Sequence, residues 1–71
     1  MIITQHSDNI KISGYRGKWH VIDSRAHSEY GTIFLLEHEI RGEDVPALIV
    51  NVHGQVILED VYNGFGDLED L

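Results

Sequence analysis

The stretch that decides the fold begins with TIFLLEHE at residues 32–39 and continues through PALIVNV at 46–52 and QVILEDV at 55–61. Apolar residues recur in these runs with a period of two, and β-branched side chains dominate them, as is typical of strands. The first run starts apolar on both faces and becomes polar on one face. The pattern predicts three strands, of which the first leaves the core toward its end.

Upstream of these runs, the sequence predicts one clear strand and one weaker strand. Trp19 and Val21 share a face of the run WHVID at residues 19–23, so we expect the Trp19 ring to lie in the core. A weaker strand is expected at residues 10–13, where two isoleucines share a face. Residues 24–31 are expected to form either a long hairpin loop or one helical turn.

Short connections separate the predicted strands. His53-Gly54 is the strongest hairpin signal, because glycine adopts a positive φ without steric cost. Gly14 and Gly17 bracket a turn, and residues 41–44 read as a polar loop. Because a parallel crossover needs a dozen or more residues, such connections predict an antiparallel meander.

The C-terminal segment at residues 63–71 predicts a short helix. Asp67 is a plausible N-cap, followed by acids in the first turn, where the helix dipole favours them. Phe65, Leu68 and Leu71 would then cover the open face of the sheet. The chain of 71 residues is therefore expected to form one small domain of the α+β class, with an antiparallel meander sheet of four or five strands and a short C-terminal helix.

The composition excludes several classes of protein. The chain has no cysteine, which excludes a disulfide scaffold, a zinc-thiolate site and a thiol nucleophile. No apolar run approaches the roughly 20 residues of a membrane helix, and no signal-peptide pattern follows Met1. We expect a cytoplasmic protein that has no membrane partner.

The net charge of −7 is unevenly distributed along the chain. Residues 1–28 carry four Lys or Arg against two acids, whereas residues 29–71 carry one, Arg41, against ten acids. The basic part contains a candidate contact surface for nucleic acid or a partner, made of aromatic and cationic residues that can track a phosphate backbone. These residues are Tyr15, Arg16, Lys18 and Trp19.

Both charged regions also have simpler interpretations. For the basic patch the simpler interpretation, a turn with solvated cations beside an anchoring tryptophan, is favoured, because net acidity opposes non-specific affinity for nucleic acid. The acidic part could imitate DNA phosphates and occupy a DNA-binding protein. Its acids, however, cluster near turns and helix starts, where acids serve solubility and capping.

The five histidines invite a metal interpretation, which their spacing does not favour. Glu37-His38-Glu39 resembles a ligand cluster, but successive side chains of a strand point to opposite faces. A site would need His20 and His38 on neighbouring strands and on one face. We therefore expect no metal and no cofactor.

Catalytic signals are also weak. Asp23, Ser24, His27 and Ser28 supply the residue types of a Ser-His-Asp constellation, but all four lie within one short segment. A working triad usually draws its members from separate elements that fix their geometry. No nucleophile elbow or phosphate-cradling glycine motif is present in the sequence. We expect that the protein is not an enzyme.

Three strings carry a family resemblance: GKWHVID at residues 17–23, FLLEHE at 34–39 and LEDVYNGF at 58–65. In this order and spacing they resemble the small domain of conjugative transposons and related mobile elements of Firmicutes. That domain occurs alone, as a transposon-encoded protein, or inside large polyvalent accessory proteins. This chain has Gly66 where the family typically has an aspartate, which bears on the helix start. The resemblance transfers no activity, cofactor or catalytic residue.

The sequence and the resemblance together predict an accessory module of a bacterial mobile element that acts by protein–protein contact. Two alternatives remain at this stage. One is nucleic-acid binding through the patch around residues 15–19, which a salt-dependent gel shift would reveal. The other is an acidic DNA mimic with an anti-restriction role, which would bind a host DNA-binding protein.

Overall fold

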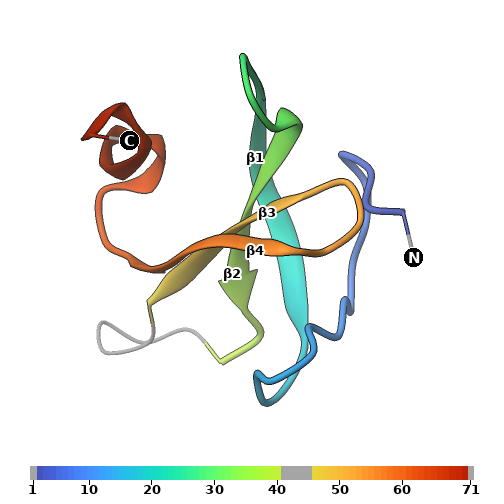
Figure 1. The fold of residues 1–71 in the computed structure, drawn as a ribbon. Coiled ribbons are helices and arrows are strands. Elements are labelled where there is room, and N and C mark those ends of the chain that lie inside the picture. Colours follow the sequence, from blue (N-terminus) through green and yellow to red (C-terminus); the bar gives the residue numbers. More distant parts are fainter. Residues whose placement is uncertain (1, 41–45, 71) are drawn as a thin grey trace.

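Four strands form an antiparallel sheet in the computed structural model, which describes residues 2–40 and 46–70 (Figure 1). The strands pair in sequence order, so the predicted meander is confirmed. A 3-10 helix follows the last strand, and none of the helices in the described residues is long and apolar enough to cross a membrane. The elements are β1 (Trp19–His27), β2 (Gly31–His38), β3 (Ala47–Asn51), β4 (Val56–Val61) and η1 (Gly64–Asp70).

The two central strands are buried on both faces, which explains their almost continuous apolar sequence. Residues 33–36 of β2 and residues 48–50 of β3 are all buried. Phe34 pairs with Val50, and Leu35 pairs with Ile49. The first pair packs into the hydrophobic cluster on one face of the sheet and the second pair into the cluster on the other face. The sheet therefore needs a cover on each side, and the two ends of the chain supply them on opposite sides of the strands (Figure 1).

The N-terminal segment covers the first face. Three of its four isoleucines are buried against Trp19, Phe34, Leu36, Leu48 and Val50. Ile10 and Trp19 exchange backbone hydrogen bonds of 2.7 and 2.8 Å. The five-strand alternative is not observed, because this pairing is an isolated bridge and the backbone turns at Asn9, where φ is 55°, and again after Ile12. The buried isoleucines of the segment are Ile3, Ile10 and Ile12, whereas Ile2 is exposed.

The C-terminal segment covers the second face, although not as the predicted α-helix. Leu68 is buried and Phe65 half-buried against a core that includes Leu35, so the expected covering role of these two side chains is confirmed; Leu71 lies outside the described residues. The element is a 3-10 helix that starts at Gly64. Two glycines in its first turn weaken α-helical preference, which favours a short, tight turn anchored by packing.

Asp67 caps this helix in another way than predicted. The expected N-cap role is wrong, because Asp67 lies inside η1 rather than before it. Its Oδ2 accepts hydrogen bonds from the backbone N–H groups of Tyr62 at 3.1 Å and Asn63 at 3.3 Å. The carboxylate thus reaches back to satisfy donors ahead of the helix, as the acid of a capping box does.

The β1–β2 connection is shorter than the sequence indicated. Both expectations for residues 24–31 are wrong, because β1 continues to His27 and β2 begins at Gly31. His27 closes the turn: its Nδ1 accepts the N–H of Glu29 at 3.0 Å, and its ring lies 4.8 Å from that of Tyr30. A bulge between Val21 and Asp23 shifts the register of β1.

The other predicted turns are confirmed where the structure describes them. Gly54 has φ of 79° in the β3–β4 hairpin. The side chain of Asn51 holds this hairpin, since its Oδ1 accepts the N–H groups of His53 at 2.9 Å and Gln55 at 3.0 Å. Gly14 and Gly17 also have positive φ in the turn before β1. The loop predicted at residues 41–44 lies outside the described residues.

Candidate functional site

The basic patch predicted from the sequence divides into buried and exposed residues. Trp19 is 5% exposed and belongs to the core of the first face, as predicted. Its ring makes edge contacts with Tyr15 at 6.4 Å and His38 at 4.9 Å between centroids. A base stacks on an aromatic face that is open to solvent, and the buried Trp19 ring offers none. The Trp19 ring is an anchor for the turn.

Tyr15 ties this turn to the far edge of the sheet. Its hydroxyl donates a hydrogen bond to the carboxylate of Glu59 on β4, 44 residues further along the chain. This hydrogen bond, together with burial and the negative charges of Glu59 and Asp60, raises the pKa of Tyr15 above its ordinary value of 10.0. The phenol therefore stays protonated and clamps the turn to β4 at neutral pH.

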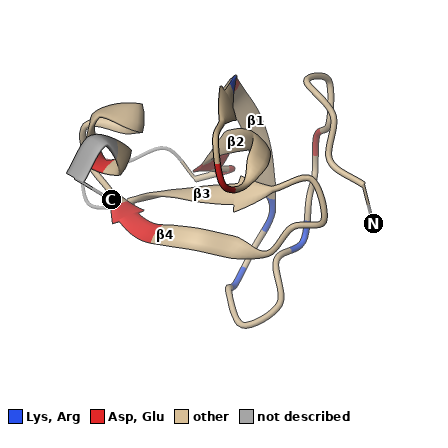
Figure 2. Cartoon of the chain, turned by 45° about the horizontal axis from the view of Figure 1, so that its top comes forward, with Lys and Arg blue, Asp and Glu red and all other residues tan. Residues whose placement is uncertain are grey.

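The cations of the patch remain exposed. Arg16 and Lys18 are open to solvent, and Lys18 lines a pocket of about 460 Å³ together with Lys11 and Glu39. Figure 2 shows the Lys and Arg positions along the N-terminal segment that leads into β1, and acidic positions at the end of β4. The charges are nevertheless mixed at the basic turn itself, because Glu39 lies beside the two lysines and Glu59 binds Tyr15.

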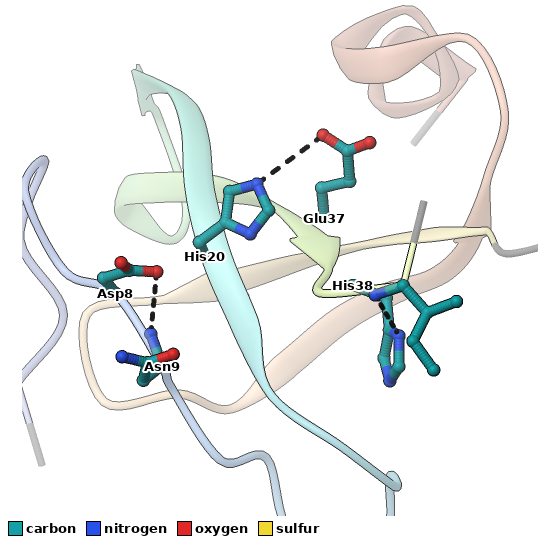
Figure 3. A network of polar contacts seen from close by, with 6 residues as sticks. Asp8, Asn9, His20, Glu37 and His38 are labelled. Carbon is teal, nitrogen blue, oxygen red and sulfur yellow. Dashed lines mark hydrogen bonds and ion pairs between the residues drawn. The ribbon is translucent and has the colours of Figure 1, made fainter. Parts of the chain in front are cut away.

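His38 organises the end of the same turn. Its Nδ1 accepts the N–H of Ile40 at 3.1 Å (Figure 3), which leaves the ring proton on Nε2. Nε2 then donates to the carbonyl oxygen of Arg16 at 3.0 Å. Gly17 lies against this imidazole so closely that a Cβ at residue 17 would overlap it. Both ring nitrogens of His38 therefore serve the fold.

The histidines do not converge on one ion. Trp19 pairs with His38 and His20 with Glu37 across β1 and β2, so the two histidines lie on opposite faces. The one-face arrangement that a metal site would need is therefore not formed. His20 Nε2 lies 3.7 Å from Glu37 Oε2 instead (Figure 3). Among the side chains that the structure describes, no three His, Asp or Glu come together as metal ligands do.

Three residues of the Ser-His-Asp constellation considered above are engaged in other hydrogen bonds. Asp23 Oδ1 accepts the N–H of Ser24 at 2.8 Å, and the Ser24 hydroxyl accepts from Gln5 Nε2 at 2.9 Å. His27 Nδ1 accepts backbone N–H groups in the β1–β2 turn. In a triad the histidine would instead bond the serine and the aspartate.

A groove crosses the second face of the sheet beside η1. Every strand contributes to it, and its volume is about 330 Å³. Two of its lining side chains are large, apolar and open to solvent: Ile22 is 47% and Tyr62 is 73% exposed. We call this feature the η1 groove; it is lined by Ile22, Leu35, Glu37, Pro46, Ala47, Val61, Tyr62 and Gly64.

Sequence reasoning did not identify the η1 groove. Ile22 interrupts the alternation of β1, being apolar on the face opposite Trp19 and Val21, and Tyr62 follows directly after β4. These two signals become meaningful only in the folded sheet, where Ile22 from within β1 and Tyr62 after β4 line the same groove.

The fold and these surfaces define a small antiparallel β domain that presents a groove with exposed apolar side chains on one face and an exposed basic turn before β1. The chain belongs to the large polyvalent protein-associated domain 18 family, whose model matches residues 1–70. The predicted membership in a large polyvalent protein-associated domain is thereby confirmed. A search of curated proteins and a search of solved structures each returned no match.

Proposed function

We propose that this domain is a non-enzymatic accessory module of a mobile genetic element and that it works by protein–protein contact. Its family associates it with large polyvalent proteins, in which such a module would dock a neighbouring protein. The conjugative-element context comes from the resemblance of residues 17–23, 34–39 and 58–65 noted above. The proposal assigns no reaction, cofactor or metal to the chain.

The observation that carries the proposal is the η1 groove. Large exposed apolar side chains beside a hollow are typical of protein interaction sites. The exposed Ile22 and Tyr62 line the groove together with the buried Leu35 and Val61. Tyrosine is also among the residues that most often dominate binding energy at protein interfaces.

Nucleic-acid binding is the second candidate, favoured by the exposed cations of the basic turn. Arg16 and Lys18 are open to solvent and could contact phosphates. Trp19, however, is buried, and Tyr15 is bonded to Glu59. The net charge of −7 also opposes non-specific affinity for a polyanion.

Two measurements on the full chain separate these functions. The chain is co-expressed with the polypeptides encoded beside it, and complexes are identified by size-exclusion chromatography; the proposal expects a stable complex with one of them. In parallel, single- and double-stranded DNA is titrated at 50 and 150 mM salt in a gel-shift assay. If no protein complex forms, and if DNA gives a salt-sensitive shift that Arg16→Ala and Lys18→Ala abolish, the function is nucleic-acid binding rather than protein contact. A complex with a host DNA-binding protein that DNA displaces would favour the acidic DNA mimic.

A further inference from the structure

We propose that Asn63 is a site of spontaneous deamidation, which forms an isoaspartyl linkage between β4 and η1 and loosens the helix from the sheet. This modification goes beyond the proposed function and does not depend on it. It is inferred from the glycine that follows Asn63, from the hydrogen bonds that the reacting groups lack, and from the place of this residue between two elements.

The dipeptide Asn63-Gly64 is suited to cyclisation. The backbone nitrogen of Gly64 attacks Cγ of Asn63, loses its proton to water and expels ammonia, so that a succinimide ring closes. Water then opens the ring at either of its carbonyl carbons, which gives aspartate or isoaspartate. In isoaspartate the backbone runs through the former side-chain carbon. Glycine has no Cβ to obstruct the attack, and it allows the backbone to rotate freely.

The structure leaves the reacting groups of Asn63 accessible. Its side chain is exposed, and its carboxamide has no hydrogen-bond partner in the part of the chain that the structure describes. Gly64 is the first residue of η1, so its N–H has no partner within the helix. In Figure 1 the chain bends between β4 and η1 at this point. Neither the attacked carbon nor the attacking nitrogen is therefore held in place by its own hydrogen bonds.

The backbone of Asn63 is only weakly restrained. Its N–H donates to Asp67 Oδ2 at 3.3 Å, and its carbonyl oxygen accepts the N–H of Gly66 at 3.3 Å. Both distances lie beyond the usual range of about 2.7–3.2 Å for such bonds. The bend can therefore make the small rotation that brings the Gly64 nitrogen to Cγ.

The two other asparagines are protected by their surroundings. Asn51 Oδ1 accepts two backbone N–H groups of the β3–β4 hairpin, and its Nδ2 donates to Gln55 Oε1 at 3.2 Å. Asn9 is followed by Ile10, whose nitrogen donates to the Trp19 carbonyl at 2.7 Å and cannot attack without breaking this bond. A β-branched residue follows each of the two and crowds the attacking nitrogen. Within one chain, Asn63 is thus set apart by both its neighbour and its contacts.

Both products weaken the attachment of η1 to the sheet. Asp67 Oδ2 accepts the N–H groups of Tyr62 and Asn63, and a carboxylate at residue 63 places a second negative charge close to it. Isoaspartate also adds a carbon to the backbone between β4 and η1. Phe65 and Leu68, which pack on the second face, then have to shift. The isoaspartyl product should therefore lose more of this packing than the aspartyl product.

The test ages the purified full chain at 37 °C and pH 8, once folded and once in concentrated urea. Cleavage after glutamate separates residue 51 from residue 63, because Glu59 lies between them, and mass spectrometry detects the exchange of ammonia for water. Because local opening of a weakly held segment costs little free energy, we expect residue 63 to react in the folded chain within about tenfold of its rate in urea. Residues 9 and 51 should keep their amides. Asn63→Gln is the matched control, because it retains a carboxamide but needs a larger ring and should not react.

The aged species are separated by ion exchange, and an isoaspartyl methyltransferase identifies the one that carries isoaspartate. We expect faster hydrogen exchange at residues 64–68 in this species than in the fresh chain, together with a lower melting temperature. Asn63→Asp introduces the charge without the added backbone carbon, so its exchange rates should lie between those of the fresh chain and the isoaspartyl species.

Two results would overturn the inference. A reaction at residue 63 that is slowed by more than about tenfold in the folded chain, relative to urea, would show that the fold protects Asn63. An isoaspartyl species with the hydrogen exchange and melting temperature of the fresh chain would show that η1 does not depend on this linkage.

Discussion

Gly17→Ala provides the sharpest test of how the turn before β1 is built. Gly17 has φ of 79°, and a Cβ added there would overlap the His38 imidazole, with 2.8 Å to its Cε1. The ring would have to move, which breaks the hydrogen bond from Nε2 to the Arg16 carbonyl and disturbs the edge contact with Trp19. Gly14 offers a matched control in the same turn, with φ of 87° and nothing within 4 Å of its added Cβ.

Both substitutions place an alanine in a left-handed backbone, but only Gly17→Ala also displaces the His38 ring. A left-handed backbone costs an alanine about 1–2 kcal/mol, and both variants bear this cost. Gly17→Ala also loses a hydrogen bond, about 1 kcal/mol, and an aromatic pair, about 1 kcal/mol. We therefore expect Gly17→Ala to be about 2 kcal/mol less stable than Gly14→Ala. That difference is a large share of the 3–5 kcal/mol or so that a core of this size rarely exceeds.

The assay is urea unfolding followed by the fluorescence of Trp19, the one tryptophan of the chain. Trimethylamine N-oxide can be added equally to all samples if Gly17→Ala is partly unfolded in buffer. In a His38→Ala background the overlap disappears, so Gly17→Ala should then cost no more than Gly14→Ala. Equal unfolding midpoints for the two glycine variants in the wild-type background would refute the reasoning.

Three further predictions concern single side chains. Trp19→Ala removes a large core aromatic, a loss of about 3–5 kcal/mol, and should leave the chain largely unfolded by circular dichroism; melting within a few degrees of the parent would contradict the core role. The pKa of Tyr15 in the folded state lies above 10.0, so the stability that its protonated hydroxyl contributes below pH 10 should be lost as the pH rises through the pKa of the folded state. In an absorbance titration, the tyrosine that ionises at the highest pH should be missing in Tyr15→Phe and should ionise at lower pH in Glu59→Gln. Asp67→Ala removes the acceptor for the N–H groups of Tyr62 and Asn63 and should cost about 1 kcal/mol, with faster hydrogen exchange at both amides; unchanged exchange would exclude this capping role.

The strands of the sheet were predictable wherever burial dictates the sequence. Residues 33–36 and 48–50 are buried on both faces, and such strands must be continuously apolar. The hairpin at His53-Gly54 was predictable for a local reason, because a positive φ favours glycine. In both cases the signal lies within a few neighbouring residues.

The second half of β1 carried no such signal. Residues 23–27 read DSRAH, a polar string that is typical of a loop. It is a strand because Asp23 to His27 pair with β2 in register, beyond a bulge that ends the alternation set by Trp19. An edge strand has one sheet neighbour and tolerates polar side chains. Its existence depends on the partner strand rather than on its own sequence.

The type of the C-terminal helix was equally beyond local reasoning. Seven residues make too few turns for a helical period to be recognised. The sequence correctly assigns Phe65 and Leu68 to the sheet face, because packing against the sheet is the only way in which this short segment can bury apolar side chains. Whether the backbone is α-helical or 3-10 depends on how those two side chains meet the core and on the bonds that Asp67 makes to the preceding residues.

The candidate surfaces show the same division. Trp19 was predictable as a core residue, but the bond from Tyr15 to Glu59 joins residues 44 positions apart and has no local signature. The η1 groove is assembled from every strand of the sheet. Ile22 and Tyr62 become neighbours of one surface only through the order of the meander. Sequence patterns identify single anchors, whereas a surface shared by several strands requires the topology.

Hydrogen–deuterium exchange of the full chain, alone and in the complex obtained by co-expression, tests protein contact through the η1 groove most directly. The account predicts slower exchange in the complex at residues 35–37 and 61–64, little change at residues 11–18, and loss of this protection in Tyr62→Ala. Protection confined to residues 11–18, with residues 61–64 exchanging as in the chain alone, would contradict it.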